Sequence, residues 1–483
     1  MRHTGSYLCS LNQVHLHRHL TRLGTPLPPP VPHREVTTVH RARVGAAAGA
    51  ILAAVLAAAT APVSAAPDPG AADTSPRGGS HHVEYFSSPT AHPRPVEVPA
   101  ATPERMARAS AAAPAPAGDG DVGQVVNNGS TADKLDVVVI GDGYTEGEQE
   151  RFHTDAKEKW QDITGVEPYT TYQNLFNVWT VDAVSRESGV SGDPGQDVVK
   201  DTALSSYFWC DGLERLLCVD TGKVEGYAAK APAADLVIVI SNSTKYGGAG
   251  YNDVSSTVGY DGIATLSGGN EQSGQIAVHE TGHSLGKLAD EYTYEEYGRY
   301  TGAETGESNT SVYDAGQLEA RQAKWYRWLG EPTPDGGVIG AFEGAGYYPL
   351  GLYRPSEDSI MRTLGREFNV VGREAMIAGF HRHASMLSAS APAGRRLTAG
   401  DTVRVGVTRL TGTGAQPELR WYLDGRELTG ARGARSLGLD GLLPAGDRRA
   451  HRLTATVSDP TAAVRDPGLR RGLTDSLTWP LAR

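Results

Sequence analysis

Short apolar runs separated by polar, glycine-rich loops fill the middle of the chain. They occupy residues 135–140, 176–184 and 236–240, and each is short enough to be a buried strand. Residues 145–160, between the first two runs, have the spacing of a helix, and a terminal helix is expected around residues 371–387. This alternation of strands and helices predicts an α/β (α+β) layer structure.

The hydrophobic period changes to two beyond residue 390. Apolar and polar side chains alternate at residues 402–407, 419–423 and 453–457, and Asp424-Gly425 supplies a hairpin turn. This pattern predicts a small all-β, sandwich-like domain at residues 391–483. Because it contains no convincing catalytic set, we interpret it as an accessory module for binding or stability.

The first 121 residues are unlike the rest. Residues 1–38, rich in proline and histidine, are interpreted as an upstream extension translated from too early a start. Residues 39–65 have a basic flank, an apolar stretch and small residues before Ala65, as in a signal peptide; an uncleaved membrane anchor is the alternative. Residues 66–121, rich in Ala, Pro, Gly and Ser, predict a disordered linker or a pro-segment. We therefore expect a secreted, extracellular protein without stable membrane association.

Net charge argues against a nucleic-acid partner, and the cysteine content bears on the compartment of the protein. The 483 residues carry a formal net charge of -11, so nothing attracts the chain generally to phosphate backbones, and no nucleic-acid partner is expected. Cys9 lies in the upstream extension, which leaves Cys210 and Cys218 for an oxidising compartment to join. Two buried thiols are the alternative.

The segment His279-Glu280-Thr281-Gly282-His283 contains the HExxH pattern. On a helix, His279 and His283 lie one turn apart on the same face, so their imidazoles can converge on one Zn²⁺. Glu280 lies beside them and can act as the general base that takes a proton from the attacking water. The pattern predicts metal-dependent hydrolysis of a peptide bond.

A catalytic zinc site requires a third protein ligand. In the metzincin layout, HExxHxxGxxH, this ligand comes three residues after the glycine, a position that Ala289 occupies here and cannot serve. We predict Asp290, one residue further on, as the third ligand. Glu291 is its nearest substitute, and the more distant Glu304 or Glu307 would imply a thermolysin-like arrangement.

Residues 279–292 resemble the signature of the bacterial immunoglobulin A metallopeptidase family, and residues 181–189, 215–220 and 243–248 resemble it too. The resemblance covers about residues 122–390. It implies a metzincin-like zinc endopeptidase domain with a mixed twisted sheet above the active-site helix, and a cleft in which extended peptide pairs with an edge strand. In this layout Met361 would form the apolar floor under the imidazoles. The resemblance does not imply that immunoglobulin A is the substrate.

Other side chains are weaker candidates. Tyr292, Tyr294 and Tyr353 could offer a hydroxyl to a developing oxyanion, although packing is the simpler role for each. His381 and His383 point to different faces of a predicted helix, so we expect surface residues there and not a second metal site.

Two functions follow from the motif. The first is a secreted, monomeric zinc endopeptidase acting on an extracellular protein or peptide. The alternative is a catalytically inactive zincin-like scaffold that serves as an extracellular or cell-wall binding protein. A scaffold would be free to lose its catalytic base, and because Glu280 and both histidines are present, the enzyme is favoured.

Overall fold

The computed structural model describes residues 79–106, 116–447 and 449–482. Cys9, the predicted extension at residues 1–38 and the predicted signal peptide at residues 39–65 lie outside the described residues. Within the described ranges, no helix combines the length and the hydrophobicity needed to cross a membrane.

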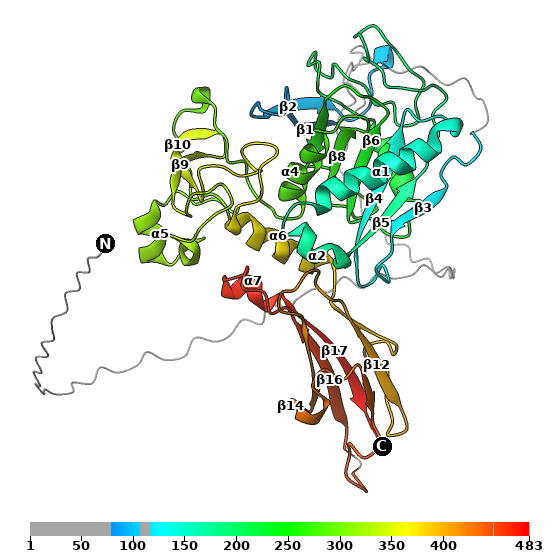
Figure 1. The fold of residues 1–483 in the computed structure, drawn as a ribbon, viewed down its shortest axis with the longest axis vertical. Helices are drawn as coiled ribbons and strands as arrows, with labels where there is room; N and C mark the ends of the chain where they lie inside the picture. Colours follow the sequence, from blue (N-terminus) through cyan, green and yellow to red (C-terminus); the bar gives the residue numbers. More distant parts are fainter. Residues whose placement is uncertain (1–78, 107–115, 448, 483) are drawn as a thin grey trace, which may run out of the picture. The chain divides into compact units, whose positions relative to one another are not determined.

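A mixed sheet of eight strands is the centre of the larger domain (Figure 1). Its strand order is β2-β1-β7-β8-β6-β4-β5-β3, and β5, β4, β6 and β8 run parallel while the other pairings are antiparallel. The strands are β1 (Ser80–Tyr85), β2 (Arg94–Pro99), β3 (Val122–Val126), β4 (Leu135–Asp142), β5 (Phe176–Val181), β6 (Leu236–Ser241), β7 (Gly248–Tyr251) and β8 (Ile263–Ser267).

Both faces of this sheet are covered, which explains the continuous apolar runs. Val137 and Val139 of β4 pack into the core on one face. Val138 and Ile140, which alternate with them, pack into a second core on the other face. The predicted central strands are therefore confirmed as buried strands of a mixed α/β layer.

The structure differs from the expected disorder at residues 79–106. β1 and β2 form an antiparallel hairpin that adds to the sheet by pairing β1 with β7. Val83, Phe86 and Val98 are fully buried there. Composition averaged over the whole stretch hid this short run of apolar side chains, which a neighbouring sheet edge can bury.

The described residues contain seven α-helices and several 3₁₀ turns. The helix predicted at residues 145–160 is observed as a 3₁₀ turn followed by α1. The predicted terminal helix is α6, which ends at His383 because the backbone is extended from Ala384 on. In Figure 1, α1 and α4 lie together on one face of the sheet. The helices are α1 (Gln149–Thr164), α2 (Tyr169–Tyr172), α3 (Thr221–Ala228), α4 (Gly274–Ser284), α5 (Ala315–Arg321), α6 (Val370–His383) and α7 (Pro467–Arg471).

Two further features belong to the larger domain. A disulfide joins Cys210 and Cys218 on the face of the sheet opposite α1. The chain between α4 and α6 forms α5 and a hairpin of β9 (Phe342–Ala345) and β10 (Tyr348–Arg354), and α5 packs with the segment after it and the start of α6 around a further small core. Its buried members are Leu318, Trp325, Trp328, Ile339 and Val371.

The C-terminal module consists of two small antiparallel sheets, as the alternating pattern predicts. One has the order β11-β12-β15 and the other β14-β13-β16-β17, and Trp421 stacks on Trp479 inside the module. Asp424 (φ 52°) and Gly425 (φ 80°) form the predicted turn. The strands are β11 (Leu387–Ala389), β12 (Thr402–Val407), β13 (Glu418–Leu423), β14 (Arg426–Glu427), β15 (Ser436–Gly438), β16 (His451–Ser458) and β17 (Thr474–Leu481).

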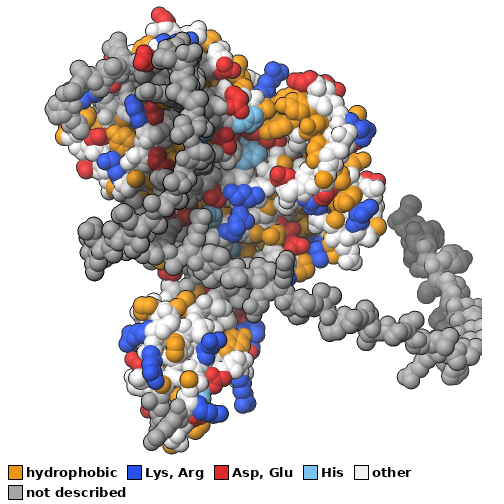
Figure 2. Space-filling view, turned by 180° about the vertical axis from the view of Figure 1, so that it is seen from behind, with side chains coloured by type: hydrophobic (Ala, Val, Ile, Leu, Met, Phe, Trp, Pro, Cys, Tyr) orange, Lys and Arg blue, Asp and Glu red, His pale blue; other side chains and the backbone are white. Residues whose placement is uncertain are grey.

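A polar contact joins this module to the larger domain. Asp459 accepts a hydrogen bond from the Tyr172 hydroxyl (2.6 Å) and lies 3.2 Å from Nε2 of His381. The His381 side chain is only 1% exposed, so the expectation of a surface residue was wrong: the module covers the face of α6 that the helix pattern left to solvent. On the face shown in Figure 2, basic, acidic and hydrophobic side chains of the module are interspersed, and none dominates.

Candidate metal centre

Helix α4 carries the HExxH segment and is buried on nearly every side. Ile276, Ala277 and Val278 pack into the core beneath the sheet. On the other side, a side chain at Gly282 would collide with the sulfur of Met361. The helix is therefore held between the sheet and the loop that carries Met361, and its histidine face is fixed.

The two imidazoles point toward each other. Nδ1 of His279 lies 2.8 Å from the carbonyl oxygen of Ile360, and Nδ1 of His283 lies 2.7 Å from that of Leu288. Carbonyl oxygens only accept hydrogen bonds, so each Nδ1 carries the proton that it donates. The two Nε2 atoms lie 3.1 Å apart.

The chain reverses after α4 and brings Asp290 over the histidines. Lys287 adopts a left-handed conformation (φ 50°), and the backbone N–H of Leu288 donates to the carbonyl of Gly282 (3.1 Å). Oδ1 of Asp290 then lies 3.3 Å from Nε2 of His279 and 3.4 Å from Nε2 of His283. The structure thus brings together the three residues that the sequence predicts as ligands.

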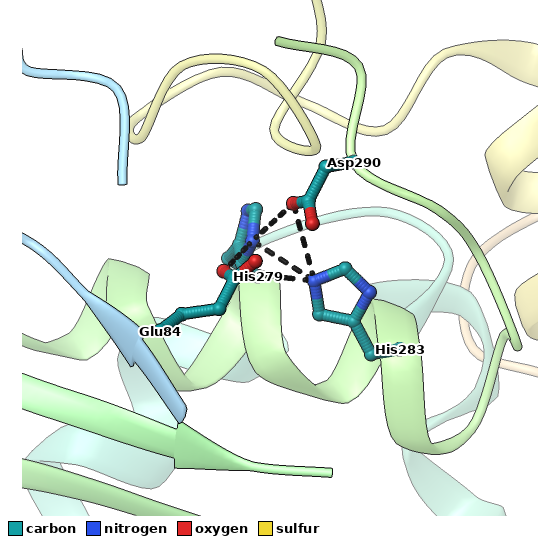
Figure 3. A group of neighbouring side chains, drawn as sticks. All are labelled: Glu84, His279, His283 and Asp290. Atoms are coloured by element: carbon teal, nitrogen blue, oxygen red, sulfur yellow. Dashed lines mark hydrogen bonds and ion pairs between the residues drawn. The ribbon is translucent and has the colours of Figure 1, made fainter. Parts of the chain in front are cut away.

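A fourth donor, Glu84, comes from β1. Figure 3 shows its side chain reaching the imidazoles from the strand while Asp290 approaches from the loop after α4. Oε2 of Glu84 lies 2.9 Å from Nε2 of His279 and 3.7 Å from Nε2 of His283. One ligand atom from each of the four side chains lies within 4.8 Å of the others.

These donors fit a divalent metal ion. With both Nδ1 atoms protonated, neutral imidazoles would present two bare Nε2 lone pairs at 3.1 Å, an arrangement that a cation shared between them stabilises. Tetrahedral zinc with bonds of about 2.0–2.1 Å separates its ligand nitrogens by about 3.3 Å. Nitrogen and carboxylate donors suit zinc and related transition metals.

The electrostatics agree with this fit. Burial alone would lower the pKa of His279, but the carboxylates of Asp290 and Glu84 outweigh it and raise that pKa to about 10. The pKa of His283 is likewise raised well above its usual value, against the effect of burial, by the same two carboxylates. The centre is a buried region of negative potential, which attracts positive charge.

Glu280 lies beside the four donors and outside their group. Its Oε2 accepts a hydrogen bond from the side-chain amide of Asn252 (2.8 Å), and its Oε1 is buried without a partner. The pKa of Glu280 is raised to about 7, mainly by burial and to a smaller extent by the negative charge of Glu84. A carboxylate with this pKa can take up and release a proton near neutral pH.

The alternative third ligands lie elsewhere. The carboxylate of Glu291 is buried and accepts hydrogen bonds from Ser359, Asn309 and Asn369 at 2.7–3.1 Å. It therefore braces the loop that contains Met361. The carboxylate of Glu304 accepts from Ser311, and neither it nor Glu307 belongs to the group of four donors.

Tyrosine hydroxyls line the other side of the centre. The hydroxyl of Tyr292 donates to Oε1 of Glu84 (2.7 Å), and that of Tyr347 lies 3.4 Å from the same atom. Tyr294 packs edge-on against Tyr292. Tyr353 belongs to β10, where it pairs with Glu343 of β9.

Reasoning from the sequence missed Glu84 and Tyr347. Glu84 sits in the run Val83–Phe86, whose apolar residues could have indicated a strand inside a stretch otherwise typical of a linker. Nothing in the sequence singles out Tyr347 among 20 tyrosines. Both reach the site through pairings between distant segments, which a local pattern does not encode.

An HExxH helix in a mixed α/β fold, with its imidazoles facing carboxylates and a further buried acid beside them, is the arrangement expected of a metallopeptidase site. The family model described as IgA Peptidase M64 matches residues 124–335 and 331–380, together just over half of the chain. The chain belongs to this family, which confirms the resemblance carried by residues 279–292. A search of curated proteins gives no match. Glu84 and the C-terminal module lie outside the matched residues.

Proposed function

We propose that the chain is a secreted, monomeric zinc endopeptidase that hydrolyses peptide bonds in extracellular proteins. Membership of a peptidase family supports the reaction class. One observation supports a metal ion at this centre. Nε2 of His279 and Nε2 of His283 face each other at 3.1 Å, while both Nδ1 atoms donate hydrogen bonds to backbone carbonyls. The disulfide between Cys210 and Cys218 supports an oxidising compartment, in line with the signal-like sequence at residues 39–65.

Each residue of the centre has a role in this proposal. His279, His283 and Asp290 would hold the ion, which when bound supplies Lewis-acid polarisation of the scissile carbonyl and of water. Glu280 would take a proton from the attacking water as the new C–O bond forms. It would deliver that proton to the amine nitrogen as the C–N bond breaks, and a pKa of about 7 suits both steps.

Tyr292 would assist on the opposite side. Its hydroxyl already donates to a carboxylate oxygen at the centre (2.7 Å), so it can donate equally to a substrate oxygen on which negative charge develops. The pKa of Tyr292 is raised well above its usual value, chiefly by burial, so the hydroxyl keeps its proton.

Replacing the base tests this function. Glu280→Gln keeps the size of the side chain and the contact with Asn252 but cannot accept a proton, so we expect casein and gelatin cleavage to fall by several orders of magnitude while bound zinc is retained. Cleavage is measured by release of soluble peptides, and zinc by elemental analysis. Glu271→Gln, which alters an exposed carboxylate just before α4, is the matched control.

Undiminished cleavage by Glu280→Gln would refute the role of the base. The binding-scaffold alternative would be favoured by a different result. In that case the native chain and Glu280→Gln bind zinc equally, and neither they nor the Glu84→Ala chain described below cleave casein or gelatin.

A further inference from the structure

The β1–β2 hairpin, residues 80–99, lies directly across the candidate metal centre. β1 pairs with β7 through Val83↔Tyr251, Glu84↔Gly250 and Tyr85↔Ala249. β8 pairs with the other side of β7, so within the described residues the hairpin takes the edge of β7 that borders the centre. An extended peptide adding to the sheet at this point would need the same edge.

The register of this pairing aims one side chain at the centre. Glu84 lies opposite Gly250, and Glu280 packs so closely against Gly250 that a side chain there would collide with its carboxylate. Glu84, the middle one of the three β1 residues that pair with β7, is therefore aligned with Gly250, which has no side chain, and with the candidate base Glu280. Glu84 occupies the place on β7 where a substrate residue would face the base.

The carboxylate of Glu84 is bound in two ways. Its Oε2 faces the imidazoles, 2.9 Å from Nε2 of His279, and its Oε1 accepts from the hydroxyls of Tyr292 (2.7 Å) and Tyr347 (3.4 Å). A peptide carbonyl under attack needs the same surroundings, with one oxygen at the metal and hydroxyl donors for negative charge. Glu84 thus makes the contacts expected of a substrate at its reacting carbon.

The rest of the hairpin fixes it over the site. Nδ1 of His92 lies 3.0 Å from the carbonyl oxygen of Arg362, and its ring stacks on Tyr292 at 5.9 Å. Arg94 lies over the ring of Tyr294. On the strand side, the Phe86 ring packs edge-on against His279 at 5.3 Å. The hairpin therefore contacts both the sheet and the loop that carries Tyr292 and Tyr294, and His279 is only 1% exposed beneath it.

The number of possible metal ligands also indicates that Glu84 closes the site. A catalytic zinc site has three protein ligands and an open position, whereas a structural site has four. With Glu84 the centre has four donors, yet Glu280 remains beside it with a buried Oε1 that has no partner. A purely structural site has no use for that side chain. The fourth donor therefore closes a site that is otherwise built for catalysis.

We infer that the hairpin at residues 80–99 is an internal, substrate-like inhibitor that occupies the peptide-binding edge of β7 and places Glu84 in the position of the scissile carbonyl. This inference rests on the proposed function. The substrate is then a protein segment that can become extended and pair with β7 once the hairpin has left. The hairpin belongs to the stretch for which the sequence left a pro-segment open, and it lies outside residues 124–380 matched by the family.

The test uses four full-length proteins: the native chain, Glu84→Ala, Glu84→Gln and the control Glu97→Gln. Glu97 is a carboxylate on β2 of the same hairpin, 65% exposed and paired with His82. Each protein is loaded with Co²⁺, and binding of acetohydroxamic acid, a small metal-chelating probe, is followed by the visible absorption of the cobalt. Circular dichroism checks the fold.

We expect Glu84→Ala and Glu84→Gln to change the cobalt spectrum and to bind acetohydroxamic acid at least 10-fold more tightly than the native chain. In parallel, zinc-loaded Glu84→Ala should cleave casein at least 10-fold faster than the native chain. Glu97→Gln should match the native chain in all three measurements.

Opposite results overturn the inference. If both Glu84 variants fold but lose the metal, Glu84 is a permanent ligand; if they keep it but bind the probe and cleave casein no better than the native chain, the hairpin does not block the site. Tighter probe binding without any casein cleavage that depends on Glu280 would refute the proposed endopeptidase and leave the closure by Glu84 standing.

Discussion

Two groups of histidine and carboxylate side chains stabilise the larger domain, one at α4 and one at the end of α6. At α6, Nδ1 of His383 lies 3.4 Å from Asp235 and Nε2 lies 3.5 Å from Asp261, so each ring nitrogen faces its own carboxylate. At α4, backbone carbonyls take both Nδ1 protons, and the Nε2 atoms of His279 and His283 face each other.

The difference shows what separates an ion-pair group from a metal centre. A proton suffices to complete the α6 group: burial alone would lower the pKa of His383, but Asp235 and Asp261 raise it to about 9. The α4 group has two nitrogens directed at one point together with two carboxylates, a set that a multivalent cation would complete. Convergence of lone pairs, and not the mere presence of buried His and Asp, marks the functional site.

The largest expected effect concerns the ligands themselves. Asp290→Asn removes the charge of a carboxylate that faces both imidazoles, so we expect zinc affinity to fall roughly 100-fold or more. Glu291→Gln, the adjacent buried acid, keeps a polar side chain among its Ser and Asn partners and should lose less than roughly 10-fold. Chelator competition measures both affinities. An equal loss of zinc affinity in the two variants would contradict the assignment of Asp290 as a ligand and of Glu291 as a residue that only supports the loop.

A second effect concerns Glu280, the buried acid beside the α4 group, which has no counterpart in the α6 group as described above. Gly250→Ala would push the carboxylate of Glu280 out of place, so we expect kcat/KM for casein to fall about 100-fold with zinc still bound. Gly226→Ala in α3, where a side chain meets nothing, is the control. Native activity in Gly250→Ala would mean that the position of Glu280 does not matter.

The smallest effect belongs to the α6 group and depends on pH. Because the folded pKa of His383 is raised from 6.5 to about 9, its stabilisation is complete below about pH 6.5 and is lost as pH rises through 9. His383→Gln should therefore lower the free energy of unfolding by about 1–3 kcal/mol at pH 6, and by much less at pH 10.

Urea unfolding of both proteins at the two pH values measures this difference, with the exposed His82→Gln as the control. Zinc content should not change in His383→Gln. A penalty that is the same at pH 6 and pH 10 would show that the imidazolium charge contributes nothing.

The sequence by itself determined the parts of this protein that rest on local periodicity. The apolar runs of β4 and β6, the helix that carries His279 and His283, and the alternating strands of the C-terminal module follow from side-chain spacing, because helix and strand periods decide which residues share a face. The same spacing brought two imidazoles to one helix face with Glu280 beside them, and it suggested Asp290, six residues beyond the end of the helix, as a ligand.

Only the tertiary structure decided what surrounds those residues. Asp290 and Glu291 are chemically similar neighbours, and the left-handed turn at Lys287 together with the partners of Glu291 determines that Asp290 faces the histidines. Glu84 reaches them from 195 residues earlier because β1 pairs with β7. Pairing between distant strands depends on the free edge and the buried surface that the folded chain offers, and no local pattern carries that information.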